Sequence, residues 1–273
     1  MATTVRILAV LGVAYLAVLA ILFALQSSLI YPAPQDVPPL TPGYSEVRLE
    51  TDDGLSLRAF HQRADHGKPT VLYFHGNGGT LAGASVSNGA VAQAGLGVLL
   101  VEYRGYGGNP GEPSEDGFYL DAEAALRWLS DEGIAPSQTV VTGNSIGGGV
   151  ATFAVQALVD RGTPPAALIL IAPFTSLPDV ASQTFWWLPV RVFLNETFPN
   201  RERLGGLAQV PVLIQHGTID NVIEDSHGKA LARIPQVAEF QSFDGSGHAL
   251  SFEQRSQEAR RDWILALRVS DTR

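Results

Sequence analysis

A β-branched run leads directly into a Gly-x-Ser-x-Gly pentapeptide in Thr139-Val140-Val141-Thr142-Gly143-Asn144-Ser145-Ile146-Gly147, and an apolar, alanine-rich stretch follows up to Leu158. A Gly-x-Ser-x-Gly between a strand and a helix puts the serine on a sharp turn at the carboxyl edge of a sheet. The helix N-terminus behind the serine favours negative charge, which develops during acyl transfer. The alternative interpretation is a glycine-rich turn with an ordinary serine.

Short apolar or β-branched runs alternate with helical patterns on both sides of this turn. The expected strands are 46–50, 55–62, 70–74, 97–103, 139–143, 167–171, 212–215 and 239–243, the first two an antiparallel pair. The expected helices are 80–94, 115–130, 146–159, 224–233 and 250–268. This order predicts an α/β-hydrolase type of α/β fold, with a mostly parallel central sheet flanked by helices.

Residues suited to acyl transfer follow separate strands of this sheet. Ser145 follows the run 139–143, Asp220 follows 212–215, and His248 follows 239–243. Because sites in such sheets lie at the carboxyl ends of the strands, we expect these turns to converge with the loop 75–79.

A serine hydroxyl is a weak nucleophile until a base takes its proton, and a neutral imidazole suits that task. We predict His248 as the base because it lies in a glycine-rich loop before the last helix. His75 and His216 each begin a His-Gly turn and are expected to shape their loops, and His227 is a weaker candidate for the base.

The base needs an acid that orients it and stabilises the imidazolium. Asp220 lies between the serine and the histidine in the chain, the order expected for this fold. Its competitors are Glu224, Asp225 and Asp244. For the oxyanion hole we predict the backbone N–H groups of Ile146 and Asn77, with Gly78 as the alternative to Asn77.

Composition excludes several classes of protein. The chain has 273 residues, a net charge of −9 and no cysteine. An acidic chain lacks the basic footprint of nucleic-acid binding, so no nucleic-acid partner is expected. Disulfides, thiolate catalysis and cysteine-based zinc sites are excluded, and no metal or cofactor is indicated. The sequence does not define the oligomeric state.

The nineteen residues from Ile7 to Leu25 carry no charge. As a helix they reach about 28 Å, close to the roughly 30 Å hydrocarbon core of a bilayer. We predict an uncleaved transmembrane signal anchor at 7–25 after a cytoplasmic tail at 1–6. Because Arg6 precedes the apolar span and positive charge favours the cytoplasmic side, the catalytic domain is expected on the extracytoplasmic face. A cleaved signal peptide and a buried core helix are the alternatives.

Five prolines between Pro32 and Pro42 indicate an extended, semi-rigid spacer, so we place a Pro-rich linker at 26–43 and the catalytic domain at 44–273. Within that domain, 173–206 is the expected short lid. It is rich in aromatic residues, which suits an acyl-binding pocket, contact with a membrane interface, or an ordinary helical cap.

The chain resembles the α/β-hydrolase superfamily and, within it, the membrane-anchored serine hydrolases called Bem46-like, or ABHD13- and ABHD17-like. The matching segments cover nearly the whole chain. They are the apolar N-terminus with Gln-Ser-Ser-Leu-Ile-Tyr-Pro at 26–32, Tyr-Phe-His-Gly-Asn at 73–77, Tyr-Arg-Gly-Tyr-Gly at 103–107, Gly-Glu-Pro-Ser-Glu at 111–115, Gly-Asn-Ser-Ile-Gly-Gly at 143–148, His-Gly-x-x-Asp at 216–220 and Gly-His at 247–248.

The resemblance implies a serine hydrolase whose catalytic triad is Ser145, Asp220 and His248. The chain lacks the cysteine cluster of the palmitoylated relatives, so its anchoring would depend on the helix. Arg104, in the motif at 103–107, is expected to have a structural role, either stabilising the active-site loops or pairing with Glu112 or Glu115.

We therefore predict hydrolysis of carboxylic ester or thioester bonds, in small-molecule or lipid-like substrates, through an acyl-enzyme. A serine peptidase or amidase would use the same groups. A membrane-tethered interaction protein that keeps the fold without the activity is the non-enzymatic alternative, since fold alone does not establish chemistry.

Overall fold

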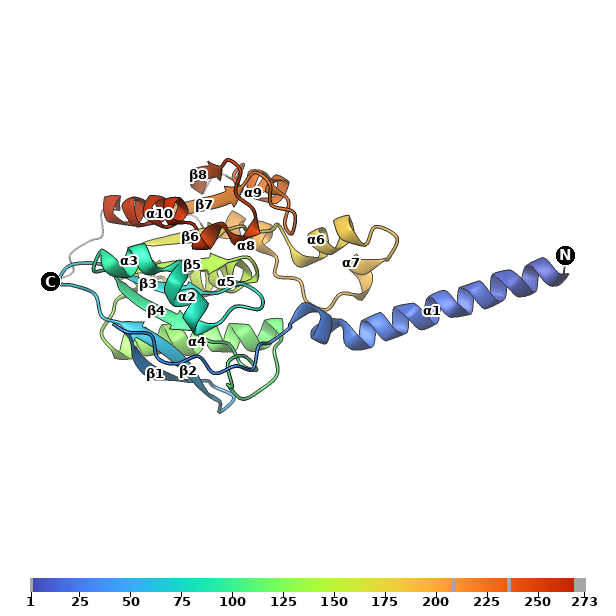
Figure 1. Ribbon diagram of the computed structural model, residues 1–273, viewed down its shortest axis with the longest axis horizontal. Helices are drawn as coiled ribbons and strands as arrows, with labels where there is room; N and C mark the ends of the chain where they lie inside the picture. Colours follow the sequence, from blue (N-terminus) through green and yellow to red (C-terminus); the bar gives the residue numbers. More distant parts are fainter. Residues whose placement is uncertain (1, 208–209, 235–236, 268–273) are drawn as a thin grey trace.

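The computed structural model describes residues 2–207, 210–234 and 237–267 (Figure 1). Within them, one eight-stranded sheet has the strand order β1-β2-β4-β3-β5-β6-β7-β8. The strands are Ser45–Glu50 (β1), Ser56–Gln62 (β2), Thr70–Phe74 (β3), Gly97–Val101 (β4), Thr139–Asn144 (β5), Ala167–Ile171 (β6), Val212–Gly217 (β7) and Val237–Phe243 (β8). β2 runs antiparallel to β1 and β4, and the other pairs are parallel. The predicted fold class is confirmed.

Helices cover both faces of the sheet. On one face lie Leu81–Ser87 (α2), Gly89–Gln93 (α3) and Gln254–Ala266 (α10), and on the other Glu115–Asp131 (α4), Ile146–Asp160 (α5) and Asn200–Gly206 (α8). The remaining helices are Ala2–Ile30 (α1), Leu177–Thr184 (α6), Val190–Phe193 (α7) and Asp225–Leu231 (α9), with 3₁₀ turns at Pro136–Gln138 (η1) and His248–Phe252 (η2).

β3 shows how the sequence builds this core. All of its residues are buried. Leu72 and Phe74 pack in the cluster on the α4 and α5 face, and Val71 and Tyr73 pack in the cluster on the α2 and α10 face. Successive side chains of a strand point to opposite faces, so an unbroken apolar run is what a strand covered on both sides requires. Each such side chain contributes about 1.5–3 kcal/mol when fully buried.

Two predicted helices differ in detail. The helix expected at 80–94 is divided into α2 and α3 at Asn88, which is fully buried and donates from Nδ2 to the Ala84 carbonyl at 2.9 Å. This side chain competes for a carbonyl of the helix and favours a break. The helix expected at 250–268 begins as the 3₁₀ turn η2, α10 starts only at Gln254, and the predicted end at Arg268 lies outside the described residues.

The N-terminal helix α1 projects from the domain (Figure 1). It continues to Ile30, so the first five residues of the expected linker, 26–30, are helical. The segment that follows is bound to the domain: Gln35 Nε2 donates to the Gly105 carbonyl at 2.7 Å, and Arg58 Nη1 donates to the Pro38 carbonyl at 2.7 Å. The end of α1 is therefore held directly against the globular part.

Candidate active site

Ser145 lies on the turn between β5 and α5, with φ 53° and ψ −119°. A left-handed φ at a residue other than glycine costs about 1–3 kcal/mol and persists only where the surroundings enforce it. A Cβ on Gly143 would lie 2.2 Å from the Gly147 carbonyl oxygen, and one on Gly147 would lie 2.2 Å from the Phe74 carbonyl oxygen. Only glycine fits these two positions, which explains the spacing of the pentapeptide.

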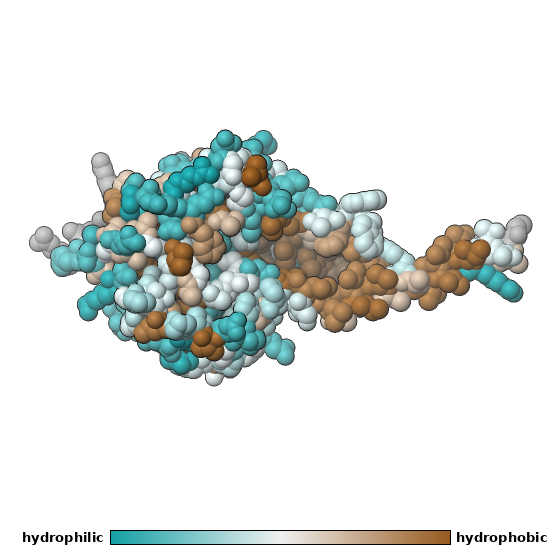
Figure 2. Space-filling view, viewed as in Figure 1, coloured by the Kyte–Doolittle hydropathy of each residue, from teal (hydrophilic) through white to brown (hydrophobic). Residues whose placement is uncertain are grey.

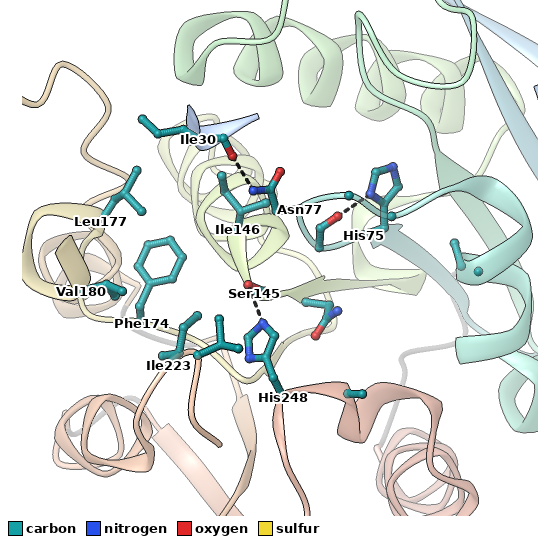
Figure 3. A pocket seen from close by; sticks show the side chains of 18 of the residues that line it. Ile30, His75, Asn77, Ser145, Ile146, Phe174, Leu177, Val180, Ile223 and His248 are labelled. Atoms are coloured by element: carbon teal, nitrogen blue, oxygen red, sulfur yellow. Dashed lines mark hydrogen bonds between the residues drawn. The ribbon is translucent and has the colours of Figure 1, made fainter. Parts of the chain in front are cut away.

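The three predicted polar residues lie in one hydrogen-bonded row, of which Figure 3 shows Ser145 and His248. Ser145 Oγ is 3.1 Å from His248 Nε2, and His248 Nδ1 is 2.8 Å from Asp220 Oδ2. Ser145 comes from the turn after β5, Asp220 from the loop after β7, and His248 from the first residue of η2. With Nδ1–H donating to the carboxylate, Nε2 is left as an acceptor facing the hydroxyl, which is the arrangement a general base needs.

Asp220 is 6% exposed, and both of its carboxylate oxygens accept hydrogen bonds. Its Oδ1 accepts from the backbone N–H groups of Val222 and Ile223, both at 2.9 Å. His216 Nε2 lies 3.5 Å from Oδ2 and 2.9 Å from the Ile223 carbonyl. Burial raises the pKa of Asp220, but the hydrogen bonds from His216, His248 and Ile223 outweigh it and hold that pKa well below its usual range. The carboxylate is therefore charged at neutral pH.

The other candidate residues lie elsewhere. His227 Nδ1 is 2.9 Å from Thr175 Oγ1, and burial lowers its pKa. Asp244 accepts from Thr218 Oγ1 at 3.2 Å, and Asp225 pairs with Lys229. Ser145 Oγ and Asp220 thus meet at His248 and not at any of these competitors.

The loop 75–79 is held beside Ser145. A Cβ on Gly76 would lie 3.4 Å from Ser145 Cβ. The side chain of Asn77 donates from Nδ2 to the Ile30 carbonyl and accepts from Tyr106 Oη at 2.8 Å. The side-chain groups of Asn77 are therefore engaged with α1 and the 103–107 loop, whereas the predicted oxyanion donor is its backbone N–H. Ile146 is the first residue of α5, and N–H groups of a first helical turn have no partner within the helix.

Glu102 organises this loop and was not predicted. It is fully buried at the end of β4, its Oε1 is 2.7 Å from His75 Nε2, and its Oε2 accepts from the Leu81 N–H at 3.0 Å. The signal in the sequence is a single acid directly after the apolar run 97–101. Glu102 joins the loop 75–79 to the start of α2, and His75 shapes its loop as expected.

A cavity of about 600 Å³ opens beside Ser145 and His248. Its walls are mostly apolar and come from α1, the lid and the loop after β7; they include Leu29, Ile30, Phe174, Leu177, Val180 and Ile223 (Figure 3). The contribution of α1 was not predicted, because contacts between residues 29–30 and the site have no local signal in the sequence. The pocket suits an acyl chain with its carbonyl group at Ser145.

Arg104 has a structural role, as expected, but its partners are not Glu112 or Glu115. It binds Asp53 through Nη1 at 2.7 Å and the fully buried Asp121 through Nε at 2.8 Å. The role of Arg104 is structural, since it joins the β1–β2 turn to α4. Within the described part of the chain, no group of three or more His, Cys, Asp or Glu residues is placed to hold a metal ion.

Known proteins resemble this chain in sequence and structure. A profile described as the alpha/beta hydrolase fold matches residues 71–191. An uncharacterized protein of Mycobacterium tuberculosis H37Rv is 35% identical over 250 residues, covering 89% of this chain and 87% of the relative. Protein bem46 of Schizosaccharomyces pombe is 31% identical over 234 residues, covering 78% and 77%.

The lysophosphatidylserine lipase ABHD12 of Danio rerio is 36% identical over 198 residues, covering 67% of this chain and 50% of the lipase. Among solved structures, an alpha-beta hydrolase from Vibrio vulnificus superimposes with a TM-score of 0.70 at 23% identity, covering 82% of this chain and 81% of that one. At that identity the likeness concerns the fold alone.

Proposed function

Because this chain belongs to the Bem46-like α/β-hydrolases, we propose that it is a membrane-anchored serine hydrolase that cleaves carboxylic ester or thioester bonds. The observation that carries the proposal is the hydrogen-bonded row from Ser145 through His248 to Asp220, set on a strained turn. A row of this kind activates a serine hydroxyl for attack on a carbonyl.

The proposed reaction has two halves. Ser145 Oγ attacks the carbonyl carbon while His248 Nε2 takes the hydroxyl proton; the tetrahedral intermediate then expels an alcohol or thiol, which receives that proton. Water next attacks the acyl-enzyme, giving its proton to His248, and the acid leaves as Ser145 is restored. Asp220, kept charged by its hydrogen bonds, stabilises the imidazolium in both halves.

The oxyanion would receive hydrogen bonds from the backbone N–H groups of Ile146 and Asn77. Ile146 is proposed because its N–H directly follows the nucleophile at the helix N-terminus, and Asn77 because its loop lies against Ser145. Backbone donors fixed in this way stabilise the intermediate without reorganising during the reaction.

The substrate is proposed to carry an acyl chain. The pocket is largely apolar, and the lipase activity in the name of the Danio rerio relative supports including monoacyl lipids among the test substrates. An apolar wall favours a long chain over acetate by about 0.8 kcal/mol for each buried CH₂ group.

Hydrolysis assays and probe labelling of the full-length protein in detergent test the proposal. Ser145→Ala is expected to lower the hydrolysis of ester and matched thioester series, from acetyl to palmitoyl, by about 10⁴-fold or more, because triad members act as a unit. Labelling by a fluorophosphonate probe should disappear together with the activity.

Ser130→Ala, at an exposed position of α4, is the matched control and should change neither the hydrolysis rates nor the fluorophosphonate labelling. Unchanged labelling of Ser145→Ala would refute the nucleophile. Turnover of amides with none of esters would favour a peptidase or amidase, and no turnover by the wild type would favour a non-catalytic role.

A further inference from the structure

The lid carries large apolar side chains on its outer surface. They gather around α7 and the end of α6, and they are exposed at 45% (Phe185), 82% (Trp186), 49% (Trp187), 81% (Val192) and 42% (Phe193). Contiguous exposed apolar surface of this kind marks an interaction site. We call these five residues the outer face of the lid. A surface of this kind is expected to be covered by a partner or a membrane.

The same lid contacts one side of α1. Tyr15 Oη donates to the Trp187 carbonyl at 3.3 Å, the rings of Phe23 and Phe193 meet edge to face at 6.5 Å, and the Asn195 N–H donates to Gln26 Oε1 at 2.9 Å. Figure 2 shows apolar residues continuing from the side of the molecule that carries the lid onto the projecting helix. The outer face of the lid is thus continuous with the exposed apolar surface of α1.

The length of α1 decides what covers this surface. α1 is long and apolar enough to cross a membrane, and none of its apolar window is buried in the protein. The uncharged stretch of α1 begins at Ile7, directly after Arg6, so residues 7–14 reach about 12 Å as a helix before Tyr15, whereas the hydrocarbon core is about 30 Å thick. A spanning α1 with Arg6 at the far surface therefore carries Tyr15, and the lid beside it, about 18 Å into the core from the side of the domain, and any tilt increases that depth.

Polar groups of the lid are paired in a way that permits this. Arg191 binds Asp179 at 2.7 Å, and its long side chain can direct its charge to the headgroups. Glu196 Oε2 accepts from Tyr31 Oη at 2.7 Å and from the Glu115 N–H at 2.6 Å. Buried or lipid-covered polar groups are costly only when they lack such partners.

We propose that the outer face of the lid lies in the bilayer leaflet beside α1, and that the acyl chain of the substrate enters the pocket from that leaflet. The pocket wall combines Leu29 and Ile30 of α1 with Leu177 and Val180 of α6, the helix that leads directly into the outer face of the lid. Leu29 lies about 21 Å further along α1 than Tyr15, which places the pocket just outside the hydrocarbon core, where membrane lipids hold their ester bonds. The entry route rests on the proposed hydrolase function, whereas the insertion of the lid does not.

Tryptophan fluorescence tests the insertion. The chain has four tryptophans, so full-length variants that retain only Trp186 or only Trp263, with phenylalanine at the other three, report on the lid and on α10 separately. In vesicles of phosphatidylcholine brominated on the acyl chains, Trp186 should lose most of its emission and Trp263 should not. Quenching of Trp186 by aqueous iodide, with no effect of the bromolipid, would overturn the proposal.

Two matched substitutions test the route. Val192→Glu puts a charge on the outer face of the lid, and Val86→Glu puts one on α2, where the valine is 62% exposed. Val192→Glu should slow hydrolysis of a long-chain ester held in vesicles by about tenfold or more, because a charge is unfavourable in the leaflet. Hydrolysis of a soluble short-chain ester should stay unchanged, and Val86→Glu should alter neither rate.

Equal slowing of both esters by Val192→Glu, or equal effects of the two variants, would contradict entry from the leaflet. If wild-type protein hydrolyses neither ester, the proposed function fails, and the quenching of Trp186 still decides whether the lid is inserted.

Discussion

Two residues of the candidate site have a backbone conformation or a charge that is unfavourable without support from their neighbours. Ser145 has a left-handed backbone, and Asp220 keeps its charge although it is almost fully buried. In both cases neighbours supply the compensation: glycines remove the clashes around the serine, and four donors surround the carboxylate. Substitutions at these neighbours should therefore affect activity more than their size suggests.

Replacement of Asp220 tests the acid. Asp220→Asn keeps the shape but removes the charge that stabilises the imidazolium, so kcat should fall by about 10²–10⁴-fold. Asp244→Asn changes an acid whose side chain accepts from Thr218 Oγ1 and does not contact His248 in the described structure, so it should leave kcat near the wild-type value. The opposite ranking in steady-state assays would assign the role to Asp244.

Arg104 supports the fold through buried charge. Arg104→Met leaves Asp121, whose side chain is fully buried, without its cation and should lower the free energy of unfolding by about 3–5 kcal/mol. Arg127→Met removes an exposed pair with Asp52 and should cost less than about 1 kcal/mol. Urea unfolding in detergent compares the two variants, and equal losses would contradict this account.

Asp121 also predicts a dependence on pH. Burial raises its pKa to about 6 in spite of its hydrogen bonds to Arg104. In the unfolded chain the pKa of an aspartate is near 3.9, so between about pH 4 and pH 6 Asp121 is protonated in the native state and ionised in the unfolded state. This difference contributes to the free energy of unfolding. The contribution is fully present below pH 4 and is lost as the pH rises through 6.

Through Asp121, the free energy of unfolding should fall by at most about 3 kcal/mol as the pH rises from 4 to 6. Asp121→Asn should abolish this fall, which urea titrations at several pH values measure. Asp53 acts in a separate range, because its hydrogen bond to Arg104 lowers its pKa to about 2. A pH slope between 4 and 6 that persists in Asp121→Asn would assign the effect to another group.

At the scale of elements, the lid is attached through the start of α4. Glu115, the first residue of α4, accepts hydrogen bonds from the backbone N–H groups of Thr197 and Phe198, and from Tyr119 Oη. Its neighbour Ser114 caps the same helix by accepting from the Gly117 N–H at 3.0 Å. One helix terminus therefore supports both α4 and the end of the lid.

Glu115→Gln should loosen the lid. Each hydrogen bond to a charged acceptor is worth about 1.5–3 kcal/mol, and the neutral amide weakens several at once. We expect faster proteolysis within 185–195 and a KM that rises more than kcat falls. Glu112→Gln, at an exposed position of the preceding turn, is the control and should change neither measurement.

At the scale of the whole molecule, α1 is long and apolar enough to cross a membrane and also borders the candidate site. Its last residues line the pocket, and its Ile30 carbonyl accepts from the side chain of Asn77 in the loop beside Ser145. In the proposed function, a helix placed in this way is part of the site as well as the anchor. The orientation of the helix in the membrane then decides in which compartment hydrolysis occurs.

The absence of cysteine makes this orientation measurable. We predict a cytoplasmic N-terminus and an extracytoplasmic domain, from Arg6 before the apolar span. In intact cells, an impermeant maleimide should label Ser130→Cys, and it should label Ala2→Cys only after permeabilisation. Labelling in the reverse pattern would place the domain on the cytoplasmic side.

Local pattern accounts for the part of the fold and site that could be predicted. The strand 70–74 was recognised because five apolar or β-branched residues in sequence suit a strand covered on both faces. The convergence of Ser145, Asp220 and His248 follows from the same alternation, because parallel strands end at one edge. Their catalytic roles stay predictions until the substitutions are measured.

Contacts between distant segments account for the rest. Three features could not be predicted from the spacing of neighbouring residues in the sequence. They are the partners of Arg104, the role of Glu102 and the helical start of the linker. The sequence alone determined the fold class, the elbow and the candidate triad, because turn chemistry and strand periodicity are properties of adjacent residues. Tertiary structure decided that the lid lies along α1 and that α1 lines the pocket, because Tyr15 and Trp187, 172 positions apart, meet only once the sheet has formed between them.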